Sequence, residues 1–504
     1  MADVRHQRKE GSAVSDRMRY VPKPIAVRSE NLVTSIKASN GSLFNGDGST
    51  QVIFDIPAMS GGYYLDTAAT RFSFNVQLQT VGASTSTSLD QNRYLFLDRG
   101  PQSIINRFQL YDASGHLLED IQNYHILYGL VKVCTGNRAV QEKRNNFFKE
   151  CRNCDGYKMA SDGSTVQDAV VSVITKNIDP AFGGAIFQKP ADGGNGTLYD
   201  YVQDPYEGTV ANNTATHIPL TLTFFSSVFG GGQDKYFPLS AMNGFRLVLT
   251  LNNANNAFQM DEGSTTNKTV AYSINDPTIY TNMIRVDPAV DRGIIDASRG
   301  TDGRIRIHSQ SWRTYSVTIQ KSDTVRNIVV PISVSSLKAL YFAHVTTSPD
   351  GYVSASSAYK RYTLSYQLFV GSVAIPTTPV QVGALGNTVA EGTYTEVTAE
   401  LLRAWHIRLN DQDMGTLLQP GQSWDEYTAA KNSRSNFFMG VELESFSNKD
   451  DTIESGANVL NNNVELRINY KQADATNSYN LVFFALHDIF IVIDPETGIT
   501  TVEF

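Results

Sequence analysis

The stretch Phe72-Ser-Phe74-Asn-Val76-Gln-Leu78-Gln79 decides the class of this fold. Its apolar residues occupy every second position, so an extended strand would carry one apolar face and one polar face. The same period of two occurs at Val52, Phe54 and Ile56. Such alternation is typical of a strand that covers a core with one face and meets water with the other. We therefore expect sheets with one buried face.

Similar apolar stretches recur along the chain and are separated by clusters of Gly, Pro, Asn and Asp. We expect further strands at 104–111, 217–225, 245–251, 269–274, 304–307, 315–319, 328–334, 337–345, 362–370, 437–443, 464–470 and 479–493. Helical periodicity is rare, and it favours short helices only at 121–133 and 395–406. Many strands joined by long loops predict an all-β protein of sandwiches or barrels rather than a doubly wound α/β fold.

Length and composition agree with a large β-rich protein. At 504 residues the chain is too long for one ordinary domain, since domains typically span about 100–200 residues. Its net charge is 42 − 50 = −8, and only 18% of its residues are charged, which excludes nucleic-acid binding by a wholly basic surface. A hydrophobic content of 41% and an aromatic content of 10% are enough to bury a core and exclude a disordered chain.

Features that would mark a secreted or membrane protein are weak. The three cysteines exclude a disulfide scaffold and favour a reducing compartment. The first 20 residues lack the apolar core of a secretory signal, so we expect the four Asn-X-Ser/Thr sequences to be turns rather than glycosylated sites. The most apolar stretch, 481–493, contains His487 and Asp488 and is shorter than the roughly 20 residues of a membrane-spanning helix.

The N-terminal segment differs from the rest of the chain. Residues 1–40 are predicted to form an extended basic arm, because seven basic residues face four acidic ones in the first 30 positions. A frayed terminus is the plain interpretation. An arm that orders against a neighbouring subunit, nucleic acid or an anionic membrane is the functional one. The basic residues are Arg5, Arg8, Lys9, Arg17, Arg19, Lys23 and Arg28.

The two halves of the chain repeat each other faintly. Residues 108–118 resemble residues 366–375, and residues 244–249 resemble residues 463–468. A duplicated β-domain explains both pairs, with a long polar insertion at about 135–216 in the first copy; chance similarity between short strands is the alternative. We place the domain boundary in the Pro-, Gly- and Asp-rich stretch 285–303, which has the composition of a linker. The predicted domains are 41–290 and 291–504.

Several of these segments resemble a known family. Four short segments are similar to the end of the first jelly roll of double-jelly-roll major capsid proteins from icosahedral double-stranded DNA viruses. They are Ile218-Pro-Leu220, Phe224-Phe225, Phe237-Pro-Leu239 and residues 244–252. Residues 306–315, 335–342 and 366–379 resemble the second jelly roll. Within this family, the segments most resemble the capsid proteins of polinton-like viruses, adintoviruses and virophages. The resemblance covers about residues 40–504.

This resemblance implies a fold and an assembly. Each half would be an eight-stranded jelly-roll sandwich, with a few short helices in the loops. Three chains would form a homotrimeric, pseudo-hexagonal capsomer that tiles an icosahedral shell. A closed ring of this kind uses heterologous contacts and does not grow into a fibre. A chain with few charges and many aromatic residues suits such interfaces.

The same resemblance implies partners and a location. The chain would bind itself, then neighbouring capsomers, penton proteins and minor or cement proteins, in a virion assembled inside the host cell. The arm would face the interior and contact the genome or an internal membrane. The insertion 135–216 would form an outward tower on which a host receptor could dock.

Sequence signatures of catalysis are missing. The chain has no P-loop, no HExxH helix, no GxSxG elbow and no EF-hand loop, so we expect a structural protein without a cofactor. The eight histidines are scattered, and no two lie within four positions of each other. Cys151-Arg-Asn-Cys154 has metal-like spacing, and with Cys134 and a histidine it is a weak candidate for a zinc cluster. Free thiols or a redox-labile disulfide are the plainer interpretations.

Two other classes of protein remain open. A carbohydrate-binding β-sandwich, such as a spike or lectin-like attachment protein, would also be acidic and aromatic, and Asp204-Pro-Tyr206 or residues 348–352 would offer the sugar contacts. A penton or minor capsid component normally carries one jelly roll. The internal repeat favours two.

Overall fold

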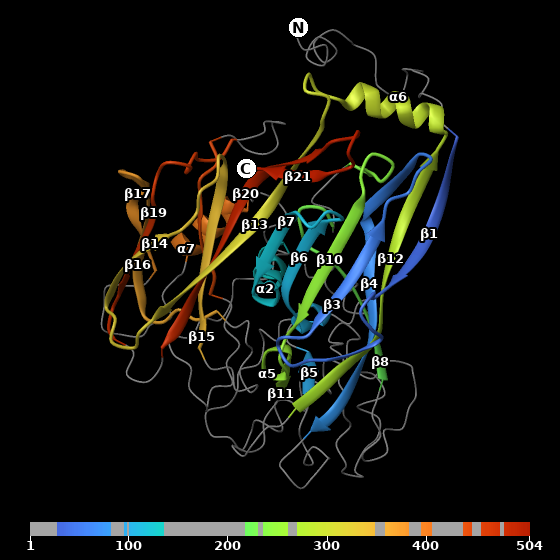
Figure 1. The fold of residues 1–504 in the computed structure, drawn as a ribbon. Helices are drawn as coiled ribbons and strands as arrows, with labels where there is room; N and C mark the ends of the chain where they lie inside the picture. The colour runs from blue at the N-terminus through green and yellow to red at the C-terminus, as the bar shows by residue number, and fades with distance from the viewer. Residues whose placement is uncertain are drawn as a thin grey trace, which may run out of the picture.

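The computed structural model describes residues 28–81, 95–97, 100–135, 217–229, 235–260, 270–347, 358–382, 395–405, 437–445, 455–473 and 478–504. Within them, two β-sandwiches lie side by side, and a helix, α6 (Pro288–Ser298), covers one end of the first (Figure 1). Every strand pair is antiparallel. The all-β prediction is therefore confirmed.

The first sandwich consists of two sheets with the strand orders β1-β12-β4-β8 and β3-β10-β6-β7. Its main strands are β1 (Ser29–Lys37), β3 (Gln51–Pro57), β4 (Tyr63–Val81), β6 (Ile105–Asp112), β7 (Leu117–Gln122), β8 (His217–Thr223), β10 (Gly244–Leu251) and β12 (Val270–Val286). Short additions are β2 (Leu43–Asn45), β5 (Leu95–Leu97), β9 (Phe237–Pro238), β11 (Phe258–Met260), η2 (Pro101–Ile104) and α5 (Ala254–Ala257). Helix α2 (Tyr124–Thr135) follows β7.

The second sandwich has the sheet orders β13-β20-β15-β18 and β14-β19-β16-β17. Its strands are β13 (Ile305–Ile319), β14 (Val325–Val330), β15 (Leu337–Thr346), β16 (Thr363–Val370), β17 (Val373–Gln381), β18 (Met439–Glu442), β19 (Val464–Tyr470) and β20 (Tyr479–Ile493). Strand β21 (Thr500–Glu503) pairs with the end of β20. Helix α7 (Thr395–Ala404) follows β17, as α2 follows β7.

Both sandwiches have the same topology. Counting the eight main strands of each in chain order, one sheet holds the first, eighth, third and sixth strands, and the other holds the second, seventh, fourth and fifth. This interleaving is the jelly roll. The repeated segments predicted from the sequence occupy equivalent strands: residues 108–118 and 366–375 span the fourth and fifth strands, whereas 244–249 and 463–468 lie in the seventh. The chain is a tandem double jelly roll.

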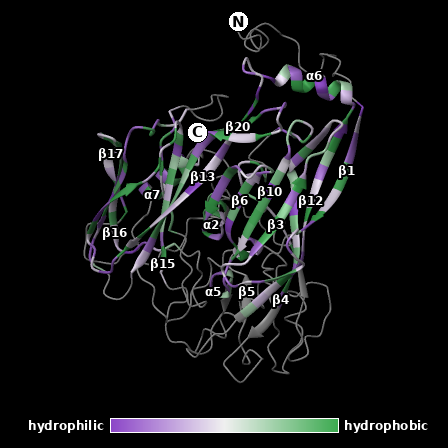
Figure 2. Cartoon of the chain, in the orientation of Figure 1, coloured by the Kyte–Doolittle hydropathy of each residue, from purple (hydrophilic) through white to green (hydrophobic). Residues whose placement is uncertain are grey.

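The sheet β13-β20-β15-β18 is buried on both faces. On β15, Leu340 and Phe342 belong to the core of the second roll, whereas Tyr341 and Ala343 belong to an apolar cluster shared with the first roll. Strand β20 lies in the middle of this sheet and pairs with both β13 and β15. Its position explains the long apolar run 481–493, because a strand buried on both faces has no polar side. Compared with β20, the strand β1 and the helix α6 mix hydrophilic and hydrophobic residues (Figure 2).

Three expectations about local structure were wrong. The segments 304–307 and 315–319 form one strand, β13, rather than two. The polar residues between them do not form a loop, because Ser309 and Ser311 make hydrogen bonds to the first roll. The stretch 285–303 is not a linker throughout, since α6 forms within it: the Asp287 side chain accepts a hydrogen bond from Ala289 N, and Pro288 takes the first helical position. The arm cannot extend to residue 40, because β1 pairs along its whole length with β12.

Candidate assembly interface

The two jelly rolls meet where β7 of the first lies against β13 of the second (Figure 1). A buried carboxylate, that of Glu119, lies at this contact. Glu119 on β7 accepts hydrogen bonds from Ser311 Oγ on β13 at 2.7 Å and from Ser227 Oγ at 2.9 Å. The Ser227 amide donates to both carboxylate oxygens at 3.0 Å. Ser309 Oγ of β13 donates to Ser227 O at 2.6 Å. Burial raises the pKa of Glu119 to about 7, although the hydrogen bonds from Ser311 and Ser227 lower it.

Aromatic side chains fill the rest of this contact. Phe225 of the first roll packs on Trp312 of β13, with ring centroids 5.7 Å apart. Trp312 also contacts Trp405 and Tyr341, at 5.9 Å and 5.7 Å. Cys134 of α2 is buried, and its thiol lies beside the Trp405 indole that follows α7. The two rolls are thus joined by one continuous apolar cluster.

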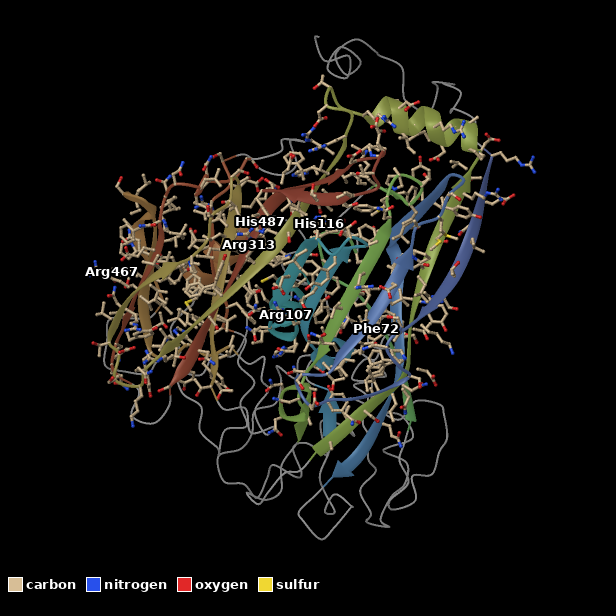
Figure 3. The ribbon with its side chains drawn as sticks, in the orientation of Figure 1. Phe72, Arg107, His116, Arg313, Arg467 and His487 are labelled. Atoms are coloured by element: carbon tan, nitrogen blue, oxygen red, sulfur yellow. The ribbon has the colours of Figure 1, made fainter. Side chains whose placement is uncertain are left out.

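The C-terminal segment adds polar contacts between the rolls. Thr500 N, on β21, donates to Asp112 Oδ2 of β6 at 3.3 Å. Asn243 of the first roll donates through its backbone to Gly498 O at 2.9 Å and through its side chain to Thr497 O at 3.1 Å. Figure 3 shows that His116 and Arg107 of the first roll and His487 of the second lie in this central region, whereas Arg467 lies at the far end of the second roll.

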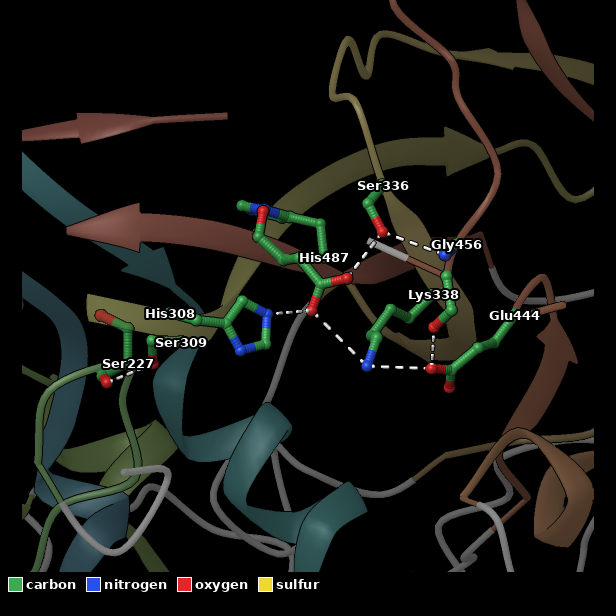
Figure 4. A network of polar contacts seen from close by, with 10 residues as sticks. Ser227, His308, Ser309, Ser336, Lys338, Glu444, Gly456 and His487 are labelled. Atoms are coloured by element: carbon green, nitrogen blue, oxygen red, sulfur yellow. Dashed lines mark hydrogen bonds and ion pairs between the residues drawn. The ribbon is translucent and has the colours of Figure 1, made fainter. Parts of the chain in front are cut away.

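A second polar network lies within the second roll beside the contact (Figure 4). It contains Lys338 of β15, Asp488 of β20 and Glu444, all with side chains that are almost completely buried. His308 of β13 reaches Asp488 Oδ1 through Nε2 at 3.0 Å. Nothing in the sequence marked these residues as a group, because 106 positions separate Lys338 from Glu444 and only the strand pairing brings them together.

At the two ends of the molecule the outer faces of the sheets are exposed, whereas the sheet faces at its centre are buried. The outer face of β1-β12-β4-β8 carries polar residues such as Arg71, Tyr280 and Asn282, and Val33 on β1 is 64% exposed. At the opposite end, β14 and β17 are the edge strands of their sheet, and Val329 and Val373 are 57% and 59% exposed (Figure 1). Exposed apolar residues at the edges of sheets are typical of surfaces that another chain covers.

The residues predicted as sites are only partly within the described segments. Arg28 is exposed directly before β1. Cys134 is buried in α2, and the described residues contain no group of three potential metal ligands. The other predicted positions lie outside the described residues: Arg5, Arg8, Lys9, Arg17, Arg19, Lys23, Cys151, Cys154, 136–216, 204–206 and 348–352. Among the described helices, none is long and apolar enough to cross a membrane.

Comparison with known proteins gives a clear result for the fold. No family model matches the sequence. No curated protein matches it either. Among solved structures, a cryo-EM structure of the Sputnik virophage matches 98% of this chain and 93% of its own, with 13% identity and a TM-score of 0.55. The crystal structure of the mavirus major capsid protein matches 97% of this chain and 93% of its own, with 10% identity and a TM-score of 0.50.

The chain has the fold of a major capsid protein. At these identities the likeness establishes the architecture, and it does so over nearly the whole length of both chains. It confirms the resemblance seen in short strand segments of the sequence, including the presence of two jelly rolls rather than one.

Proposed function

We propose that this chain is a viral major capsid protein, a structural subunit that forms homotrimeric, pseudo-hexagonal capsomers. The observation that carries the proposal is the contact between the two rolls. One outer face of the second roll, on β13-β20-β15-β18, is buried against the first roll, whereas the equivalent face of the first roll, on β1-β12-β4-β8, is uncovered. Two equivalent domains joined through only one of two equivalent faces form an incomplete repeat.

Repeating the same contact between chains would complete it. In the contact within the chain, the first roll contributes β7, helix α2 and the segment 224–229. The equivalent parts of the second roll are β17, α7 and the segment after β18. Of these, β17 lies at the opposite end of the molecule from β1 (Figure 1), whereas the end of α7 packs against the contact within the chain. A head-to-tail contact between the β17 end of one copy and β1-β12-β4-β8 of the next is heterologous, and it forms a closed ring when its rotation returns to the first copy after three chains. Three chains then contribute six similar jelly rolls to the ring, which gives it a pseudo-hexagonal outline.

The other interpretations of the sequence receive less support. A penton or minor capsid component with a single jelly roll does not fit a chain with two. The residues considered for sugar binding lie outside the described residues, so no geometry supports a lectin. Within the capsid proposal, the shell of a virion is the location, and penton proteins, minor or cement proteins, the genome, an internal membrane and a host receptor are the further partners to test.

The solution mass of the purified chain tests the proposal. We expect a trimer of three times 55.5 kDa by light scattering, at low and at high salt. Val373→Asp should shift the mass toward the monomer, because a carboxylate would be buried in the contact between chains. Ile294→Asp is the matched control, since Ile294 is similarly exposed but lies on α6, across the end of the sandwich. A wild-type monomer would contradict the proposal.

A further inference from the structure

Lys338 carries a primary amine that is sealed inside the second jelly roll between two carboxylates. Its side chain is 0% exposed, as is that of Glu444, and Asp488 is 1% exposed. Lys338 Nζ lies 3.0 Å from Glu444 Oε1 and 3.5 Å from Asp488 Oδ1. Within the described residues it makes no well-directed hydrogen bond to either. Charges buried in this way are costly, because they lose their hydration and depend on each other for compensation.

The backbone places these groups at a fixed separation. Strands β15 and β20 are neighbours, and their register shifts between Leu337 and Ala339, so Lys338 is the extra residue of a β-bulge. Bulges of this kind redirect a side chain and are frequent next to reactive sites. The Asp488 amide donates to Ser336 O at 3.1 Å, so the backbone of Asp488 is hydrogen-bonded next to the strand that carries Lys338. The amine and the carboxyl are therefore held in a reactive approach by the sheet itself.

Two donors converge on the carboxyl of Asp488. His308 Nε2 lies 3.0 Å from Oδ1, and Ser336 Oγ donates to Oδ2 at 2.6 Å. Gly456 N in turn donates to Ser336 Oγ at 3.0 Å and orients it. These contacts lower the pKa of Asp488 against the effect of burial. The same donors would stabilise the negative oxygen that forms when a nucleophile adds to this carboxyl, as an oxyanion hole does.

Glu444 stands on the other side of the amine. It is the nearer carboxylate to Lys338 Nζ, and it also accepts a hydrogen bond from Ser455 Oγ. Its shorter distance to Nζ suits a group that exchanges a proton with the amine. Three different residues therefore suit three roles: Lys338 as nucleophile, Asp488 as electrophile and Glu444 as proton carrier. Figure 4 shows the ammonium group of Lys338 beside Glu444.

We propose that Lys338 and Asp488 form an intramolecular isopeptide bond, a covalent cross-link between β15 and β20. Glu444 takes one proton from the ammonium group and passes it to the Asp488 carboxylate, and the neutral Nζ attacks Cγ of the resulting carboxylic acid. The N–C bond forms, one C–O bond breaks, and the oxygen leaves as water with two of the three ammonium protons, one of them returned by Glu444. The ammonium and the carboxylate become one amide and one water, so the step needs no oxidant, reductant or further reactant.

Such a bond would fasten the two central strands of the sheet that is buried on both faces, directly beside the contact between the rolls. It would also remove one buried cation and one buried anion, leaving Glu444 to accept a hydrogen bond from the new amide N–H. This inference does not depend on the capsid function, because the bond would form in a single chain before any assembly.

Mass spectrometry of the full-length chain tests the proposal. The intact, denatured wild-type protein should be lighter than its sequence mass by one water, and a protease digest should contain a branched peptide that joins residues 338 and 488. Lys338→Met and Glu444→Gln should both have their full sequence masses. Lys321→Met, at an exposed lysine of the same roll, should still lose the water.

The outcomes are separable even where a variant fails to fold, because the mass and the branched peptide of the wild-type protein together decide whether the bond exists. A wild-type chain with its full sequence mass overturns the proposal. A branched peptide at Glu444 instead of Asp488 overturns the assignment of the roles. Loss of water in the Glu444→Gln variant at the wild-type extent would remove Glu444 from the chemistry.

Discussion

At the residue scale, Glu119 is the group that makes the contact between the rolls sensitive to pH. All of its hydrogen-bond donors are hydroxyls or an amide, and no described cation forms an ion pair with it. Its pKa rises from 4.5 to about 7 because burial disfavours the carboxylate. The folded state therefore holds this proton more tightly than the unfolded state. The resulting stabilisation is fully present below pH 4.5 and is lost as pH rises through about 7.

We expect Glu119→Gln to remove this dependence, because the amide mimics the protonated acid at every pH. The wild type should lose about 3 kcal/mol relative to the variant between acid and weakly alkaline pH. Denaturant unfolding at a series of pH values measures the difference. Glu496→Gln is the control, since that side chain is 79% exposed. Parallel pH profiles for wild type and Glu119→Gln would mean that folding does not shift the pKa of Glu119, which would contradict the prediction.

At the scale of single elements, α6 shows how a short helix depends on its first residues. Asp287 Oδ1 accepts from Ala289 N at 2.8 Å and caps the helix. Asp291 is the one buried residue of α6, and it accepts a hydrogen bond from Ser240 Oγ at 3.1 Å. The helix is therefore attached to the first roll by few contacts, and its cap matters more than in a helix with a large buried face.

Asp287→Ala should weaken α6 by about 1 kcal/mol, because an amide at the helix start loses its acceptor. The expected result is faster hydrogen exchange across residues 288–298, with little change in the strands of either roll. Asp296→Ala serves as the control, since Asp296 lies in the last turn and does not cap the helix. Equal exchange in the two variants would mean that the cap does not limit opening.

The same scale shows what could be predicted from the sequence. Strands with one polar face, such as β4, were recognisable because alternation depends only on local burial. The helix α6 was missed because Asp-Pro and Gly also occur in linkers, although Asp-Pro is a helix start signal. Strand β13 was divided in two because its polar serines satisfy Glu119 and Ser227 across the contact, and partners so distant in the chain leave no local signal.

At the scale of the whole molecule, the fold class followed from the repeated strand pattern, whereas the contact between the rolls did not. The buried Lys338, Glu444 and Asp488 look like ordinary charged residues in the sequence. The apolar run 481–493 was visible, but its cause, a sheet covered on both faces, required the second layer. An apolar cluster shared by both rolls also implies that they unfold together rather than as independent domains.

The arm provides the prediction that belongs to the whole assembly. Because β1 begins at Ser29 and pairs along its length with β12, removal of residues 1–27 should leave both rolls and the trimer intact. The deletion removes six of the seven basic residues of the arm, so it should impair closure of shells around an acidic genome or membrane. Light scattering measures the trimer, and electron microscopy of particles from producing cells measures the shells.

A full-length variant with these six residues changed to glutamine separates charge from length, because it keeps the chain that a neighbouring subunit would bind but removes the attraction to anions. If charge drives closure, the glutamine variant should fail as the truncated chain does, while both remain trimeric. Closed shells from the glutamine variant alone would assign the arm to contacts between subunits. Normal shells from the truncated chain would remove the arm from assembly altogether, and contacts between the rolls of neighbouring chains would then have to hold the shell without it.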